Sequence, residues 1–600
     1  MDTATLPIEE SWKLDDIFPD SAAIRAERQA LQGSLDGLTD GQGRLGESAA
    51  ILADALEAST EAWRRVAKLR CFAMLQSDTD IRNAAAQALR EEIDLLTTDL
   101  SGRVAWIRPE ILALPSSTLE TYLDEEPRLA IHRFFLQDLM RQRDHVLTPG
   151  EERIMAEASA ITRTPGSLFN VLHNVEIPPA QVTLEDGRQV ELTPTEFFKH
   201  RTTGNRNDRE LLFTAYYESQ ARFQQTLGEN LAGQIRAHIF RARARRYPSC
   251  VAAALDGNAV PEGVYRNLIA QTHAQLPTFY RYFELRKRSL GVERLEYHDL
   301  HCPLTGDEPT RYEPQDAMRT IRESLAPLGS MYLAAVDEAF DNRWIDWHPQ
   351  NGKRSGAYAT GWAYDVHPYA LLNFLGDYDS VSTATHELGH ALHSYFSNQR
   401  QPFATADYSI FVAEVASTLN EALLLNHKLE CADDETEQQF LLSRYLDSFR
   451  VTFHRQTLFA EFELEIHDRS ERGEALTGER LNEIYLQLLR KYHGHDESIV
   501  HIDERYGGEW MLVPHFYYNF YVYQYATGIV ASTALAEAIV NKTPGSVERY
   551  VEFLHRGGSD YSLQLLRTAG VDLEQAQPYE DACSAFERRL DQLEALLPDA

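Results

Sequence analysis

The chain has 600 residues, of which 43% are hydrophobic and 25% are charged, a composition that is ordinary for a globular protein and excludes a disordered chain or a small module. Its 91 acidic residues outnumber the 58 basic ones and leave a formal net charge of −33. Because such a surface repels phosphate backbones and anionic lipid, we expect neither nucleic acid nor a membrane as a partner.

The five cysteines lie far apart and form no Cys-X-X-Cys pair, so they predict neither a disulfide framework nor a thiolate zinc site. The opening residues, MDTATLPIEESWKLDD, contain no basic head followed by an apolar stretch, and we expect no secretory signal. A reducing cytoplasm is therefore the predicted location.

Most of the chain follows a 3.6-residue apolar repeat, which predicts a mainly α fold. Successive long amphipathic helices are expected over residues 20–175. A short hairpin is expected at 182–192, where an Asp-Gly pair interrupts alternating apolar residues. We expect the hairpin to separate an N-terminal helical region, 1–195, from a second region, 196–600.

Two segments of the second region depart from plain amphipathic helix. Residues 236–246 contain five arginines, which in so acidic a chain indicate a solvated or interdomain helix face rather than a nucleic-acid site. Residues 297–375 contain short apolar runs and predict a small sheet, with 368–375 as its last strand. Everything after residue 381 returns to a helical pattern.

The sequence HELGH lies within a helix expected at about 380–396. Four residues along a helix make almost one turn, so His386 and His390 leave the same face and can bind one Zn²⁺. Glu387 lies one step around the helix, where a general base can act on water at the metal. A chance occurrence of this motif in a helical scaffold is the alternative.

A catalytic zinc needs a third protein ligand. His393 shares a face with His390, but three ligands along one straight helix would span about 10 Å, too far for a tetrahedral shell. Glu414 is the better candidate, because it lies among apolar residues of a second helix that reaches about residue 427 and can pack antiparallel on the first. Glu421, two turns further on, either accepts the spare N–H of a histidine ligand or forms an ordinary salt bridge.

Several motifs of this chain resemble those of oligoendopeptidase F, within the zinc oligopeptidase family that includes thimet oligopeptidase. They are HELGHALH, FVAEVASTLNE and WMLVPHFYYNFYVYQYATG, and the resemblance extends to SWKLDDIFPD near the start and to SGAYATG. The resemblance implies His386, His390 and Glu414 as zinc ligands and Glu387 as general base. It also implies a mainly helical, clam-like molecule, in which residues 196–600 form a catalytic region with helical walls around a channel for short peptides.

A tyrosine-rich segment at about 511–540 is nearly free of charged side chains. We predict one interior helix there, on which His515, Tyr518 and Tyr525 share a stripe. Phenol and imidazole N–H or O–H groups can stabilise the oxyanion that forms when a peptide carbonyl is attacked. The sequence leaves open which tyrosine, Tyr521 included, has this role, and a packed aromatic core is the alternative.

The strand expected at 368–375 lies just before the metal helix. Peptidases with this zinc motif bind the substrate as an added strand along a sheet edge, so we predict that this strand provides the edge. An ordinary hairpin is the alternative.

The predicted function is therefore that of a zinc endopeptidase, with one Zn²⁺ per chain, that hydrolyses internal bonds of short unstructured peptides. A carboxypeptidase-like exopeptidase of similar helical build is an alternative, because an arginine that anchors a free carboxylate would not be recognisable in the sequence. A non-catalytic helical scaffold is a further alternative, and it predicts no bound metal.

Overall fold

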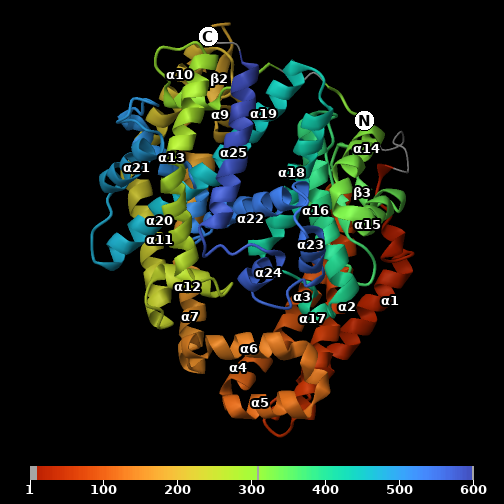
Figure 1. Ribbon diagram of the computed structural model, residues 1–600. Coiled ribbons are helices and arrows are strands. Elements are labelled where there is room, and N and C mark those ends of the chain that lie inside the picture. The colour runs from red at the N-terminus through yellow and green to blue at the C-terminus, as the bar shows by residue number, and fades with distance from the viewer. Residues whose placement is uncertain (1–9, 307–309, 598–600) are drawn as a thin grey trace. The chain divides into compact units, whose positions relative to one another are not determined.

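The computed structural model describes residues 10–306 and 310–597 and is mainly helical, as predicted (Figure 1). The described residues form two compact units, and each unit combines three separate segments of the chain. The first takes its residues from Met1–Arg143, Pro309–Glu430 and Leu535–Val571, and the second from Asp144–Glu308, Cys431–Ala534 and Asp572–Ala600. The boundary expected at residue 195 falls inside the second unit, so that division of the chain stays a prediction.

The first unit is built from helices and one small sheet. A long hairpin of two helices, α2 and α3, shares its apolar core with Tyr369 and Leu371 of the sheet. The helices of this unit are α1 (Ser21–Ser34), α2 (Ala49–Thr79), α3 (Ala84–Val104), α4 (Ile107–Ala113), α5 (Ser116–Glu125), α6 (Arg133–Arg141), α14 (Pro314–Ser324), α15 (Gly329–Asp341), α16 (Tyr378–Arg400), α17 (Phe403–Ala406), α18 (Ile410–Cys431), α23 (Ser546–His555) and α24 (Ser562–Ala569).

The sheet of the first unit has three short strands, β3 (Ile345–Asp346), β4 (Tyr358–Thr360) and β5 (Tyr369–Leu371). Their order is β3-β5-β4, with β3 parallel and β4 antiparallel to β5. The sheet lies within the expected range, but the prediction that 368–375 forms its edge is wrong. Because β5 is the central strand, its backbone groups already pair on both sides.

The second unit contains a hairpin and long helices. Strands β1 (Ala180–Thr183) and β2 (Gln189–Leu192) pair antiparallel at the expected position. The helices are α7 (Pro149–Thr162), α8 (Thr164–Val171), α9 (Pro194–His200), α10 (Arg206–Ala221), α11 (Gln224–Ala244), α12 (Cys250–Asp256), α13 (Glu262–Ser289), α19 (Glu435–Phe449), α20 (Arg455–Glu471), α21 (Gly478–Tyr492) and α25 (Gln577–Leu596). Within the part of the chain that the structure describes, no helix has both the length and the apolar character of a membrane span.

The tyrosine-rich segment is not the single helix that we predicted. It consists of two short 3-10 helices, η11 (Glu504–Leu512) and η12 (Pro514–Tyr517), followed by a bend and then by α22 (Tyr523–Val540). At the bend, Asn519 and Phe520 have left-handed backbone angles, with φ of 58° and 59°. No α-helix can continue through two consecutive left-handed residues, so the predicted helical stripe does not exist.

Candidate metal centre

Helix α16 carries both histidines of the HELGH motif. Its first turn is capped by Asp377, whose side chain accepts a hydrogen bond from the N–H of Ser380 at 2.9 Å. His386 and His390 leave the same face, one turn apart, and their Nε2 atoms are 3.2 Å from each other. The i, i+4 spacing thus places two imidazole nitrogens beside one point.

Helix α18 packs antiparallel against α16, as predicted. Near the start of α16, Ser382 donates to Glu421 at 3.0 Å, whereas further along Ser394 contacts Tyr408, just before α18, at 2.9 Å. The two helices approach each other closely at Gly389, where an added Cβ would lie 2.6 Å from the Cα of Ser417. Only glycine permits so close an approach of two backbones.

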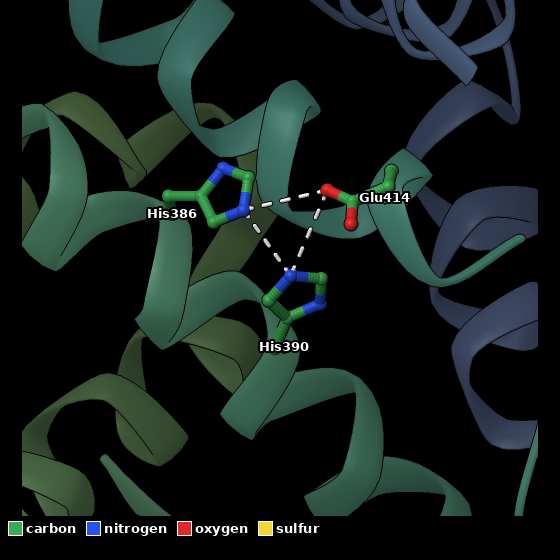
Figure 2. Close-up of side chains that lie close together, drawn as sticks. All are labelled: His386, His390 and Glu414. Carbon is green, nitrogen blue, oxygen red and sulfur yellow. Dashed lines mark hydrogen bonds and ion pairs between the residues drawn. The ribbon is translucent and has the colours of Figure 1, made fainter. Parts of the chain in front are cut away.

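This packing brings the three residues predicted as metal ligands together (Figure 2). The Oε2 atom of Glu414 is 3.4 Å from Nε2 of His386 and 3.8 Å from Nε2 of His390. In a tetrahedral zinc shell with bonds of about 2.0–2.1 Å, neighbouring ligand atoms lie about 3.3 Å apart. The donor atoms therefore fit the shell of one metal ion with little rearrangement.

Further groups hold the two imidazoles in this orientation. Glu421 accepts a hydrogen bond from Nδ1 of His386 at 2.6 Å, which leaves Nε2 directed at Glu414. The backbone of Ala413 lies beside the imidazole of His390 and opposes the lowering of its pKa. Such outer partners fix the tautomer and the ring orientation of histidine ligands, so the predicted role of Glu421 agrees with its position.

The charges around the three donor atoms favour a cation. Burial lowers the pKa of His386, but hydrogen bonds to Glu414 and Glu421 outweigh this effect and raise it to about 10. Burial and the neighbouring His386 lower the pKa of His390 to about 4. The acidic side chains of Glu414 and Glu421 thus lie on two sides of His386, an arrangement that favours a cation at this position.

Glu387 lies beside this group and is not one of its three members. Its side chain is buried, with 8% exposed, and the backbone of Ala359 in β4 lies close to its carboxylate. Burial raises the pKa of Glu387 to about 7, and the carboxylates of Glu414 and Glu421 add to this effect. The edge strand β4 thus packs against α16 beside the metal position, a contact that the sequence did not indicate.

His393 does not belong to the group of donors. It is fully buried, and its ring stacks on Tyr408 with the centroids 3.6 Å apart. Neither of its ring nitrogens has a hydrogen-bond partner among the described residues. This environment agrees with the interpretation of His393 as a packing residue.

His515 and the predicted tyrosines lie in the second unit. Although the segment is not one helix, the ring of His515 lies 5.5 Å from that of Tyr518, 6.1 Å from Tyr521 and 6.0 Å from Tyr525, measured between centroids. The bend between the 3-10 turn and α22, rather than a helical stripe, brings these rings together. All three tyrosines therefore remain candidates for the oxyanion role.

No pattern in the sequence indicates the residue that secures this bend. The fully buried Glu463 of α20 accepts a hydrogen bond from the backbone N–H of Phe520 at 2.6 Å. Burial raises the pKa of Glu463 to about 8, and this hydrogen bond opposes the rise. Because the two residues are 57 positions apart, only the tertiary fold reveals the contact.

Comparison with known proteins identifies the family of this chain. The model of peptidase family M3 matches residues 200–585, and that of the oligopeptidase F N-terminal region matches residues 110–178. The chain belongs to peptidase family M3. This M3 peptidase is 38% identical to oligopeptidase PepF of Bacillus subtilis, over 99% of its own length and 88% of the relative's. It is 36% identical to group B oligopeptidase PepB of Streptococcus agalactiae, over 98% of both chains.

The solved structures that are similar to this protein are also those of peptidases. A Chlamydophila abortus protein described as a peptidase superimposes with a TM-score of 0.93 at 34% identity, over 99% of both chains. Oligoendopeptidase-F of Enterococcus faecium superimposes with a TM-score of 0.73, also at 34% identity, over 95% of this chain and 98% of the other. The predictions of a mainly helical fold, of this family and of a metallopeptidase are therefore confirmed, and the relatives support an endopeptidase that acts on oligopeptides.

Proposed function

We propose that this M3 peptidase is a zinc endopeptidase that hydrolyses internal bonds of short, unstructured peptides. One observation carries the proposal: His386, His390 and Glu414 converge, in a member of a peptidase family, on a point beside the carboxylate of Glu387. Two imidazoles and a carboxylate form the ligand set of catalytic zinc sites, in which a fourth position stays open for water or substrate. The relatives' names, oligopeptidase and oligoendopeptidase, support short peptides as substrates.

In the proposed reaction each group of the centre has one task. When bound, the zinc supplies a Lewis acid toward water and the peptide carbonyl. Glu387 takes a proton from the attacking water and passes it to the leaving amine. Glu421 keeps His386 in the orientation that ligation needs. The backbone of Ala359 lies close to Glu387 and favours its ionised form.

We further propose that His515 and at least one neighbouring tyrosine donate hydrogen bonds to the oxyanion formed on the peptide carbonyl. Tyr518 and Tyr525 are the first candidates, and Tyr521 is the third. The packing of all four rings within one cluster supports a shared task. Donors fixed by a folded segment stabilise developing charge without having to reorient during the reaction.

The sheet topology changes the proposed substrate edge. We propose that the substrate pairs with β4, because β4 is an edge strand whereas β5 is central. The backbone of the same strand lies close to Glu387 at Ala359, so a peptide along β4 would run beside the general base. Recognition through main-chain hydrogen bonds predicts broad sequence preference.

For the cellular location we propose the cytoplasm. All five cysteines are free thiols, and four of them are buried. This usage is typical of proteins that work in reducing compartments.

A nested series of unstructured peptides, from about five to twenty residues long, tests the proposed activity when it is incubated with the enzyme beside a stable folded protein. We expect cleavage at internal bonds of the peptides and survival of the folded protein, because unfolding a typical domain costs about 5–15 kcal/mol. Mass spectrometry reports each cleavage position. Stepwise release of single terminal residues would establish the exopeptidase alternative, and rapid digestion of the folded protein would contradict the proposed substrate class.

A further inference from the structure

The second unit contains a cavity of about 280 Å³ close to His515 in the sequence. Helices α8 and α11 and the 3-10 helix η12 pack together around it. Pro514, Tyr517 and Tyr518 contribute to its wall, so the cavity is bounded by the residues on either side of His515. Two arginines, Arg163 and Arg241, also line it.

Neither of these arginines has a carboxylate partner. Arg241 is half-buried and donates to the hydroxyl of Thr162 at 2.6 Å, and Arg163 is exposed and approaches the hydroxyl of Ser159 at 3.4 Å. Among the described residues, no Asp or Glu oxygen lies within ion-pair distance of either guanidinium. In a chain with a net charge of −33, two neighbouring cations without an acidic partner are unexpected.

Other arginines of the same helix behave differently. Arg236 pairs with Glu229 at 2.5 Å, and Arg245, just after the end of α11, pairs with Glu152 at 2.9 Å. Arg236 and Arg245 therefore have carboxylate partners, and the prediction of a solvated or interdomain face for this segment stays a prediction. Arg241, in contrast, has no carboxylate partner among the described residues and lines the cavity.

An anion in the cavity would offset the repulsion between the positive charges of Arg163 and Arg241. Burial lowers the pKa of Arg241, and the positive charge of Arg163 lowers it further. A carboxylate accepts paired hydrogen bonds from the planar guanidinium group, with both charge and geometry matched. The volume is below that of the usual pocket for a drug-sized molecule, about 300–1,000 Å³, so it suits one residue of a peptide rather than a whole ligand of that size.

We propose that Arg163 and Arg241 bind a carboxylate group of the peptide substrate in this cavity. The inference rests on the proposed peptidase function and adds a site of substrate recognition to it. The carboxylate is supplied either by the C-terminus of the peptide or by an acidic side chain. In both cases the charge anchors the peptide against the wall formed by Tyr517 and Tyr518.

The test measures binding separately from turnover. Fluorescence anisotropy gives the Kd of four labelled peptides for the zinc-loaded Glu387→Gln variant. The peptides share one sequence, carry either Glu or Gln at one internal position, and end in either a free or an amidated C-terminus. We expect removal of the relevant carboxylate to weaken binding about ten- to hundredfold, the range for a hydrogen bond to a charged group. Loss on amidation assigns the cavity to the C-terminus, and loss on the Glu-to-Gln exchange assigns it to a side chain.

Arginine variants then locate the effect. Arg163→Gln, at an exposed position, and Arg241→Gln should each reduce the preference for the carboxylate, and Arg241→Lys should retain part of it. Arg236→Gln is the matched control on the same helix and should leave the preference unchanged.

Equal Kd values for all four peptides, or a preference that survives in both glutamine variants, would overturn the carboxylate site. Turnover of the same peptides by the wild-type enzyme tests the proposed function on its own. A protein that binds the carboxylate but cleaves no peptide would keep this site and lose that function.

Discussion

The close contact between helices α16 and α18 at Gly389 leads to a specific prediction. At Gly389 of α16, an added methyl group would lie 2.6 Å from the Cα of Ser417, 2.8 Å from the carbonyl oxygen of Ala416 and 2.9 Å from the backbone N of Ser417. All three atoms belong to the backbone of α18, so no side chain can rotate away. We expect Gly389→Ala to push the two helices apart.

The required displacement follows from the contact distances. Ordinary van der Waals contact begins at 3.4 Å, so the 2.6 Å contact must lengthen by about 0.8 Å. If the helices separate as rigid bodies, the 3.4 Å between His386 and Glu414 grows toward about 4.2 Å, beyond the 3.3 Å or so of a tetrahedral shell. Overpacking of this kind costs about 1–3 kcal/mol. If most of this cost falls on the ligand geometry, zinc affinity falls by about five- to hundredfold.

Competition with a chromophoric chelator measures the zinc affinity, and thermal unfolding of the metal-free protein measures the cost to the fold. Gly102→Ala in α3 is the matched control, because nothing lies within 4 Å of the added methyl group there. That variant should bind zinc normally and gain about 0.5–1 kcal/mol in helix stability. Wild-type zinc affinity and stability in Gly389→Ala would refute the reasoning, since the helices would then not be held at this distance.

Further predictions concern Glu421, Glu414 and Glu463. Glu421→Ala should lower metal affinity about ten- to hundredfold, measured by the same competition, because His386 loses the acceptor that orients it. Glu414→Ala should lose zinc by elemental analysis while His393→Ala retains it, and the reverse pattern would show that the third ligand is misassigned. Glu463→Ala should lower kcat more than it raises KM, because the bend that positions His515 loses the acceptor for the N–H of Phe520. Glu463→Gln keeps an acceptor for this N–H and should stay active. Burial raises the pKa of Glu463 from 4.5 to about 8 in the folded state. The free energy of unfolding of the wild type should therefore fall as the pH rises from about 4.5 to about 8. Denaturant titrations at several pH values should not show this fall in Glu463→Gln.

The sequence was informative where the chemistry depends on local spacing. Two histidines four residues apart must share a helix face, and a carboxylate among apolar residues of the next helix calls for a partner such as a metal. No prediction was made from Gly389, although a glycine inside a helix often marks a close backbone approach. These inferences need only the geometry of one helix and the cost of burying a charge.

Non-local contacts explain what the sequence did not show. The order β3-β5-β4 depends on pairing between strands that are separated along the chain, and nothing within 368–375 indicates a central position. The bend at Asn519 and Phe520 is held by Glu463, which lies in another helix. An apolar pattern alone could not distinguish this bend from a continuous helix.

The most direct test of the central claim compares metal content and turnover in the wild type and in Glu387→Gln. The account predicts stoichiometric zinc in both proteins, because Glu387 is not among the three donors. Cleavage of an unstructured peptide should fall about 10²–10⁴-fold or more in the variant, since only the general base is removed. Loss of zinc in Glu387→Gln, or wild-type turnover in that variant, would contradict the assignment of the centre.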